Sequence, residues 1–310
     1  MATADIRINR LSRVSVDKSI EPEHAFDFAA LGSGRLLPDE LLSIVGLDVK
    51  LTEKQRAKLS REEVAAMLAA GIRFEAVLNA VFSLELAYTR RLGDPRHTYM
   101  LHEVAEETRH QRAFLRLREQ ISPVAKNPLD LPIPRFVARR IIRMTVKHEG
   151  LFGVMLLAGE EIPDFLQKLA SEHPQTDPVL REVNRYHRAE EARHLSFART
   201  VFPEVWAKLG RLERWRVRRV APRLIGLLFE TMVHPGVYEV VGLPGFKTWR
   251  AANRSAPRRA IRYRATRPIL DTMCSAGVMP RDRVPRGWRD LCGVDRNGRP
   301  LANDPALPVG

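Results

Sequence analysis

The chain has few of the features on which several classes of protein depend. Its 310 residues include only two cysteines, Cys274 and Cys292, which cannot make a disulfide framework or a cysteine-based metal site alone. Its longest apolar run, residues 151–158, is much shorter than the roughly 20 residues of a membrane-spanning helix. Its first ten residues lack the apolar stretch of a secretory signal. The sequence therefore predicts a cytoplasmic protein with no transmembrane segment.

Acidic residues are also in short supply. The 37 Asp and Glu residues are outnumbered by 51 Lys and Arg residues, and the net charge is +14. Such a balance suits nucleic acid, an anionic membrane surface or an acidic partner. The basic stretch 247–267 holds Trp249 and Tyr263, but no recognised nucleic-acid motif accompanies it. Nucleic acid is therefore not favoured as a partner, and a homodimer stays open beside a monomer.

Helical periodicity dominates the chain between residues 60 and 235, and no strand-like alternation of any length interrupts it. Ser60 and Glu63 form a capping-box pattern at the start of this region. Asp94 and Pro95 have the order expected at a second helix start. We expect a bend at residue 150 or 163 in the third helix, a stop at Pro203 in the fourth and a kink at Pro222 in the fifth. The predicted helices span residues 60–93, 95–120, 135–171, 177–203 and 212–233.

The sequence divides into two parts by composition. Residues 1–245 are expected to form one all-α domain, with loops and short helices before a core at about 60–235. Residues 246–310 are rich in Arg, Pro and Gly. They are predicted to be an irregular basic C-terminal extension packed on the helices.

Two short segments of the chain resemble each other. Residues 106–110 read EETRH and residues 190–194 read EEARH. Each places a Glu and a His three positions apart, so that carboxylate and imidazole project from one helix face. Four-helix di-iron proteins use this motif twice and add one Glu from each of the other two helices. The sequence therefore predicts a ferritin-like four-helix bundle core with extra helices and a metal site, to which the motifs contribute Glu107, His110, Glu191 and His194.

Spacing indicates the two further carboxylates. Glu75 precedes Glu107 by 32 residues, and Glu160 precedes Glu191 by 31 residues. The two halves agree, as expected when one helix runs up and its partner runs back down. The competitors are Glu85 for the first position and Glu161 or, more weakly, Glu149 for the second.

His187 distinguishes this pattern from the common one with two histidines. His187, Glu191 and His194 follow at i, i+4 and i+7, which places three potential ligands along one stripe of a helix. The equivalent position in the first half is Glu103, which could accept a hydrogen bond from a ligand imidazole. The arginines of the motifs could pair with neighbouring glutamates on the solvent-exposed face, or they could support the metal ligands from behind, and neither is predicted to be catalytic. They are Arg109 and Arg193.

With these motifs the sequence resembles the para-aminobenzoate N-oxygenase family of non-haem di-iron oxygenases. The resemblance covers most of residues 10–235 and includes the stretch 99–103, which leads into the first motif. Its most specific part is the triad of His187, Glu191 and His194. The resemblance implies a ligand set of four carboxylates and three histidines, which falls here on Glu75, Glu107, His110, Glu160, His187, Glu191 and His194.

The resemblance also implies a reaction. Members of the family activate dioxygen, as co-substrate, at two iron ions and oxidise an amine to a hydroxylamine or nitro group. The chain contains neither a Rossmann glycine fingerprint nor cysteine ligands for an iron–sulfur cluster, so an external electron donor is expected. The predicted function is N-oxygenation of a small (aryl)amine. The alternatives are C-hydroxylation or desaturation of a lipid-like substrate, iron binding without catalysis, and manganese in place of iron.

Overall fold

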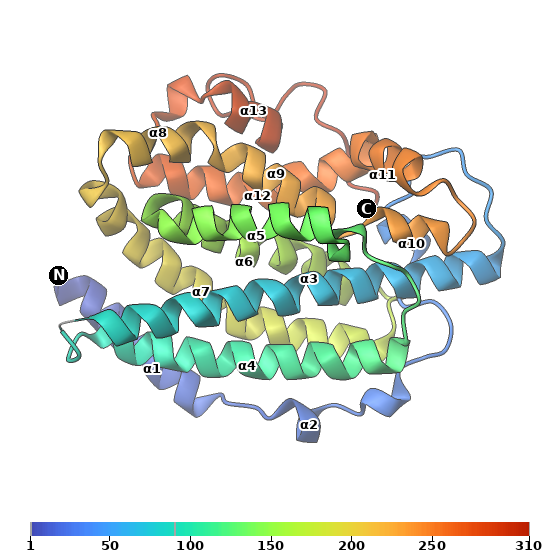
Figure 1. Cartoon of the computed structure of the whole chain (residues 1–310), viewed down its shortest axis with the longest axis horizontal. Coiled ribbons are helices and arrows are strands. Elements are labelled where there is room, and N and C mark those ends of the chain that lie inside the picture. The colour runs from blue at the N-terminus through green and yellow to red at the C-terminus, as the bar shows by residue number, and fades with distance from the viewer. Residues whose placement is uncertain (1, 90, 310) are drawn as a thin grey trace.

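The computed structural model describes residues 2–89 and 91–309, and the regular elements of these residues are helices, with one isolated β-bridge between Val294 and Pro300. Four long helices form the core, and α3 packs along α4 while α6 packs along α7 (Figure 1). The predicted all-α fold with a ferritin-like bundle is confirmed. The core helices are α3 (Glu53–Tyr88), α4 (Pro95–Ile121), α6 (Glu149–Glu172) and α7 (Pro178–Lys208).

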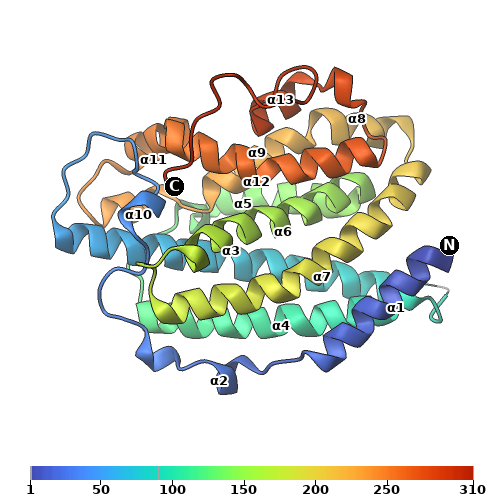
Figure 2. The ribbon, with the colours of Figure 1, turned by 180° about the vertical axis from the view of Figure 1, so that it is seen from behind.

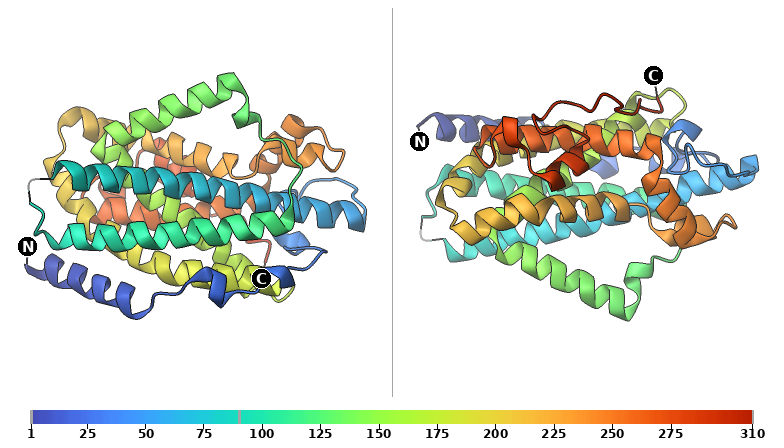
Figure 3. Two further views of the ribbon diagram at one scale, coloured as in Figure 1. Left: turned by 60° about the horizontal axis from the view of Figure 1, so that its bottom comes forward. Right: turned by 90° about the horizontal axis from the view of Figure 1, so that it is seen from above.

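Shorter helices cover the bundle. Helix α1 (Ala2–Asp17) lies against α4 and α7, while α9 (Ala221–Thr231) and α12 (Ala256–Ser275) lie against α6 (Figure 2). Helix α5 (Pro132–Lys147) contributes no buried side chain among those described and lies on the outside of the bundle (Figure 3). The remaining α-helices are α2 (Pro22–Ala25), α8 (Arg211–Arg219), α10 (Pro235–Glu239), α11 (Gly245–Arg254) and α13 (Arg286–Cys292).

The start of α3 differs from the prediction. The capping box is made by Thr52 and Gln55, eight residues before Ser60 and Glu63. The Ser60 hydroxyl instead accepts hydrogen bonds from the backbone N–H groups of residues 36 and 37, at 2.9 and 2.8 Å. Glu63 accepts one from Ser43 N. The predicted capping box was wrong because two segments carry the same motif and the second fixes the N-terminal loop to the helix.

Prolines also act differently from the prediction at several helix boundaries. The predicted third helix breaks into α5 and α6 at His148, close to the expected bend at residue 150, and Pro163 lies inside α6 as the predicted span allowed. Pro203 lies inside α7, which continues to Lys208. Pro222 lies in the first turn of α9, where a missing N–H costs no hydrogen bond. The start of α4 is as predicted, because Asp94 accepts a hydrogen bond from the N–H of residue 96 at 2.9 Å.

The C-terminal segment is more regular than the sequence predicted. Residues 246–310 include α12, which packs on α6, and most of α11. Ser255 caps α12 by accepting a hydrogen bond from Arg258 N, and Pro257 occupies the first turn. A composition rich in Arg and Pro is therefore compatible with helix here, since this proline lies where a helix tolerates it. The division of the chain at residue 245 stays a prediction.

Among the described residues, α3 is the one helix that is long and apolar enough to span a membrane by length and composition alone. Its apolar stretch is interrupted by a few charged residues, so the helix contains no long uninterrupted apolar run. One third of this stretch is buried inside the structure. The helix packs along α4 and buries Glu62, Glu63 and Glu75, as a core helix of a bundle does.

The apolar core lies in two clusters at the two ends of the bundle. On α4, Tyr99 and Met100 belong to the first cluster, and Phe114 and Leu117 belong to the second. The buried residues between them on α4 are polar and include residues 103, 106, 107 and 110. A polar layer therefore crosses the middle of the bundle with apolar side chains on both sides.

Candidate metal centre

All seven side chains predicted as ligands meet in this polar layer. None of them is more than 4% exposed. Their ligand atoms form two groups of four, and within each group these atoms lie within 4.8 Å of one another. Glu191 belongs to both groups. The first group is Glu75, His110, His187 and Glu191, and the second is Glu107, Glu160, Glu191 and His194.

Two carboxylates lie between the imidazoles of the cluster. Glu107 approaches His110 Nδ1 at 3.4 Å with one oxygen and His194 Nδ1 at 3.1 Å with the other. Glu191 approaches the same two nitrogens at 3.3 and 3.1 Å. A carboxylate that faces two nitrogen ligands through its two oxygens has the arrangement of a bridge between two metals.

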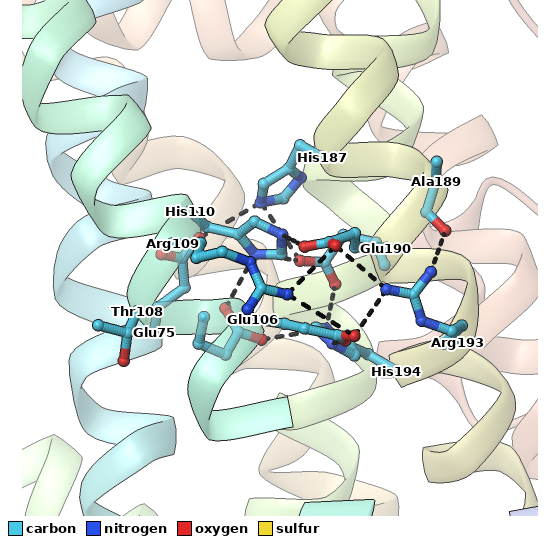
Figure 4. A network of polar contacts seen from close by, with 12 residues as sticks. Glu75, Glu106, Thr108, Arg109, His110, His187, Ala189, Glu190, Arg193 and His194 are labelled. Carbon is cyan, nitrogen blue, oxygen red and sulfur yellow. Dashed lines mark hydrogen bonds and ion pairs between the residues drawn. The ribbon is translucent and has the colours of Figure 1, made fainter. Parts of the chain in front are cut away.

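The imidazoles of His110 and His194 are each held by a glutamate of the opposite motif. His110 Nε2 lies 2.9 Å from Glu190 Oε2, and His194 Nε2 lies 2.7 Å from Glu106 Oε2 (Figure 4). Each carboxylate can accept the Nε2–H of the imidazole, which leaves Nδ1 without a proton and directed at the cluster. The contacts cross from α4 to α7, so each motif orients the candidate ligand of the other.

Two arginines complete this crossed network. Arg193 Nη2 donates to Glu106 at 2.7 Å and lies 3.3 Å from Glu190. Arg109 Nη2 lies 3.4 Å from Glu190. The solvent-face interpretation of these pairs was wrong, because Glu106 and Glu190 are only 1% and 2% exposed. The two arginines balance the two glutamates, and the network adds no net charge beside the cluster.

His187 is oriented by a different partner. Its Nδ1 lies 2.8 Å from Gln167 Oε1, and its Nε2 faces Glu75 at 3.3 Å and Glu191 at 3.2 Å. When the amide oxygen accepts the Nδ1–H, Nε2 is free to bind a metal. The hypothesis that Glu103 supports a ligand imidazole was wrong. Glu103 is fully buried, neither of its oxygens has a hydrogen-bond partner, and burial raises its pKa to about 8.

The electrostatics of the cluster favour cations. Burial and the neighbouring carboxylates raise the pKa of Glu75 and Glu160 well above 4.5, and one oxygen of each has no hydrogen-bond partner. Burial opposes charge on His110 and His194, yet nearby glutamates raise both pKa values well above 6.5. Four carboxylates in a dry site need compensating charge. Two divalent cations would balance them, and the oxygen and imidazole donors suit iron or manganese.

The alternative carboxylates lie elsewhere. Glu85 and Glu149 are exposed, and Glu161 forms an ion pair with Arg199. The sequence interpretation missed the roles of Glu106, Glu190 and Gln167. The duplicated first Glu of each motif carried a signal for the first two, whereas nothing in the sequence marked Gln167.

A cavity of about 110 Å³ lies beside the cluster. Glu75, Glu160, His187 and Glu191 form one part of its wall. Most of the remaining wall is apolar and comes from α3, α6, α9 and α12. An engineered cavity of about 150 Å³ is enough to bind benzene. The cavity is therefore on the scale of a small apolar group held next to the candidate metal ligands.

These features define a class of protein. A helical bundle that gathers four carboxylates and three imidazoles from four helices has the arrangement of the carboxylate–histidine metal proteins of the ferritin-like type. Residues 3–277 match the family described as P-aminobenzoate N-oxygenase AurF. The chain belongs to this family of di-iron oxygenases.

Curated relatives add similarity without an assigned activity. The chain is 29% identical over 167 residues to the proteins named Uncharacterized protein Rv0885 from Mycobacterium tuberculosis and Uncharacterized protein Mb0909 from Mycobacterium bovis. Each match covers 53% of this chain and 48% of the relative. The chain thus spans about half the length of the curated relatives that it matches.

Proposed function

We propose that this chain binds two iron ions and uses dioxygen to oxidise a small organic substrate, most directly an (aryl)amine. The observation that carries the proposal is the pair of ligand groups that share Glu191. The proposed ligands are Glu75, His110, His187 and Glu191 for one ion, and Glu107, Glu160, Glu191 and His194 for the other. Manganese is the alternative metal.

The protein would orient the metal ligands and the substrate and would exclude water from the reacting groups. Bound iron supplies electron transfer to dioxygen. Glu106, Glu190 and Gln167 would hold the three imidazoles in the tautomers that bind metal. The apolar clusters at both ends of the bundle would exclude water from the reacting groups, and the cavity beside His187 would hold the substrate.

In the proposed reaction, an amine, dioxygen, two electrons and two protons yield a hydroxylamine and water. A new N–O bond forms, and the second oxygen atom leaves as water. The electrons come from an external donor protein or reductant. We place this reaction in the cytoplasm.

The test is oxidation by iron-loaded protein under defined conditions. Metal-free protein is loaded with ferrous iron under argon, given a chemical reductant and exposed to oxygen with a panel of aromatic amines. We expect hydroxylamine or nitro products by mass spectrometry, with label from ¹⁸O₂. Absence of labelled product across the panel, with iron bound and reduced, would contradict N-oxygenation.

A second candidate reaction uses the same site. The mostly apolar wall of the cavity would also suit C-hydroxylation or desaturation of a lipid-like substrate. Acyl substrates therefore belong in the same panel, since oxidised acyl products without amine oxidation would favour this reaction. Iron far in excess of about two ions per chain, with no product from either class, would favour iron binding without catalysis.

Replacement of His187 should affect one of the two ions more than the other. In His187→Ala the first group of ligands loses one of its two imidazoles and keeps only that of His110. The second group does not include His187 and stays intact. We expect bound iron to fall from about two ions per chain toward one, measured by metal analysis after gel filtration. His102→Ala on α4 is the control and should keep both ions, and equal iron in the two variants would argue against His187 as a ligand.

A further inference from the structure

The cavity beside the cluster has a second polar region. Besides the four candidate ligands, its lining includes one carboxylate, Glu63, and one guanidinium, Arg258. Between the two polar regions the wall is formed by apolar side chains such as Met67, Leu68 and Phe74. A substrate that fills the cavity would therefore meet polar groups at two places and an apolar surface between them.

Arg258 is an unusual residue for such a place. It lies on α12, is 5% exposed, and its guanidinium is 4.3 Å from the centroid of the Phe229 ring. Among the residues that the structure describes, no side-chain hydrogen bond and no ion pair is formed by this guanidinium. Burial of a cation without a counterion is costly, and the face of the Phe229 ring offsets only part of that cost, so an anion that enters the cavity would be a favourable partner.

Glu63 does not fill that role. Both of its oxygens accept hydrogen bonds from Ser43, which in turn is 2.8 Å from the hydroxyl of Tyr238. Its charge acts on Arg258 without a direct ion pair. Burial raises the pKa of Glu63 to about 7, which weakens it further as a counterion near neutral pH. The N–H donors of the Arg258 guanidinium therefore stay available to a ligand in the cavity.

We propose that Arg258 binds a carboxylate of the substrate and thereby sets which end of the molecule reaches the metal cluster. Only one part of this proposal rests on the proposed function, namely that the other end of the substrate is oxidised at the metal cluster. A planar guanidinium matches the two oxygens of a carboxylate, while the apolar wall matches the body of the molecule.

The spacing along α3 adds a length requirement. Glu63 and Glu75 are twelve residues apart on one helix, which separates their Cα atoms by about 18 Å at 1.5 Å per residue. Glu75 belongs to the candidate metal cluster, and Glu63 marks the region of Arg258. This is a backbone separation, and the side chains at its two ends shorten the gap that a substrate must span. We therefore expect a carboxylic acid longer than one aromatic ring, and because the cavity is only about 110 Å³, the flexible side chains of Met67 and Met232 in its wall would have to move to admit it.

Binding of simple carboxylates tests this assignment. Decanoate, its neutral analogue decanamide and 4-aminobenzoate are titrated into the protein by calorimetry under argon without reductant. We expect decanoate to bind about tenfold or more tightly than decanamide, and more tightly than 4-aminobenzoate. In Arg258→Met this preference should vanish, whereas Arg259→Met, at the exposed neighbouring position, should retain it.

Further variants keep the result interpretable. Glu63→Gln removes a competing negative charge and should strengthen decanoate binding. If Arg258→Met fails to fold, Arg258→Lys is the substitute. It keeps the positive charge but loses the planar pair of N–H donors, so a reduced preference for decanoate over decanamide is expected. Equal binding of decanoate and decanamide to the wild type, or a preference that survives Arg258→Met, overturns the proposal. Tight binding of 4-aminobenzoate that depends on Arg258 overturns the length requirement.

The proposal can fail or succeed separately from the oxygenase function. The titrations involve no turnover, and chelator-treated protein should show the same preference for decanoate because Arg258 is not a metal ligand. Loss of metal binding or of oxidation would leave the carboxylate preference in place. Loss of the preference alone would leave the metal centre in place.

Discussion

Glu191→Ala is expected to abolish binding of both metal ions. Glu191 is the one residue common to the two ligand groups, and its two oxygens face three imidazoles at 3.1–3.3 Å. Each ion would lose a bridging carboxylate, and the total negative charge of the four-carboxylate cluster would no longer match two divalent cations. We expect iron content after reconstitution to fall from about two ions per chain to near zero, measured by metal analysis.

The matched control is Glu182→Ala, since Glu182 is an exposed carboxylate on the same helix. It should keep full metal content and the same circular dichroism spectrum. A Glu191→Ala protein that is folded and still retains two ions would show that the two groups do not share a bridge. Retention of one ion would mean that only one group depends on Glu191.

Much of the candidate centre could be predicted because helix geometry is local. A Glu and a His three residues apart share a face whatever surrounds them, so the two motifs already placed two pairs of side chains. Glu75 and Glu160 followed from the agreement of two spacings, a test that Glu85 did not meet. All of these side chains come together in the structure.

The crossed network could not be predicted, because it depends on how α4 and α7 face each other. Glu106 precedes Glu107 by one residue, so its side chain points about 100° away and is typical of a solvent-exposed position in the sequence. In the bundle that direction leads to His194 on α7 rather than to water. A pattern within one helix cannot distinguish a wet face from a face that meets a second helix.

Helix boundaries failed for a related reason. Pro203 lies inside α7, where packing against neighbouring helices can outweigh the lost hydrogen bond. Ser60 and Glu63 looked like a cap but hold a loop that is distant in sequence. Arg258, within a segment predicted to be irregular, reaches the cavity only because α12 folds back onto α6.

Arg193→Ala should destabilise the protein strongly. Arg193 donates to Glu106 and also lies close to Glu190, and its side chain is 8% exposed. Its removal leaves two buried carboxylates with only Arg109 as a nearby cation in the network. Breaking a buried ion pair from one side costs about 3–5 kcal/mol. We expect a loss of that size in the free energy of unfolding, measured by urea denaturation.

The control is Arg188→Ala on the same helix. Arg188 pairs with Asp164 at 2.8 Å, but both side chains are about one quarter exposed, so the expected loss is about 1 kcal/mol or less. The double variant Arg193→Ala with Glu106→Gln should recover part of the lost stability, because it removes the uncompensated charge. Equal losses for the two arginine variants would contradict the buried network.

The size of the Arg193→Ala effect should also depend on the metal. Without metal, glutamates near His194 raise its pKa, so that a protonated imidazole can partly replace the arginine beside Glu106. With metal bound through Nδ1, the imidazole is neutral and Arg193 is the stronger partner of Glu106. The variant should therefore lose more stability in its iron-loaded form than in its metal-free form. A loss that is the same in both forms would mean that His194 does not exchange a proton for a metal ion.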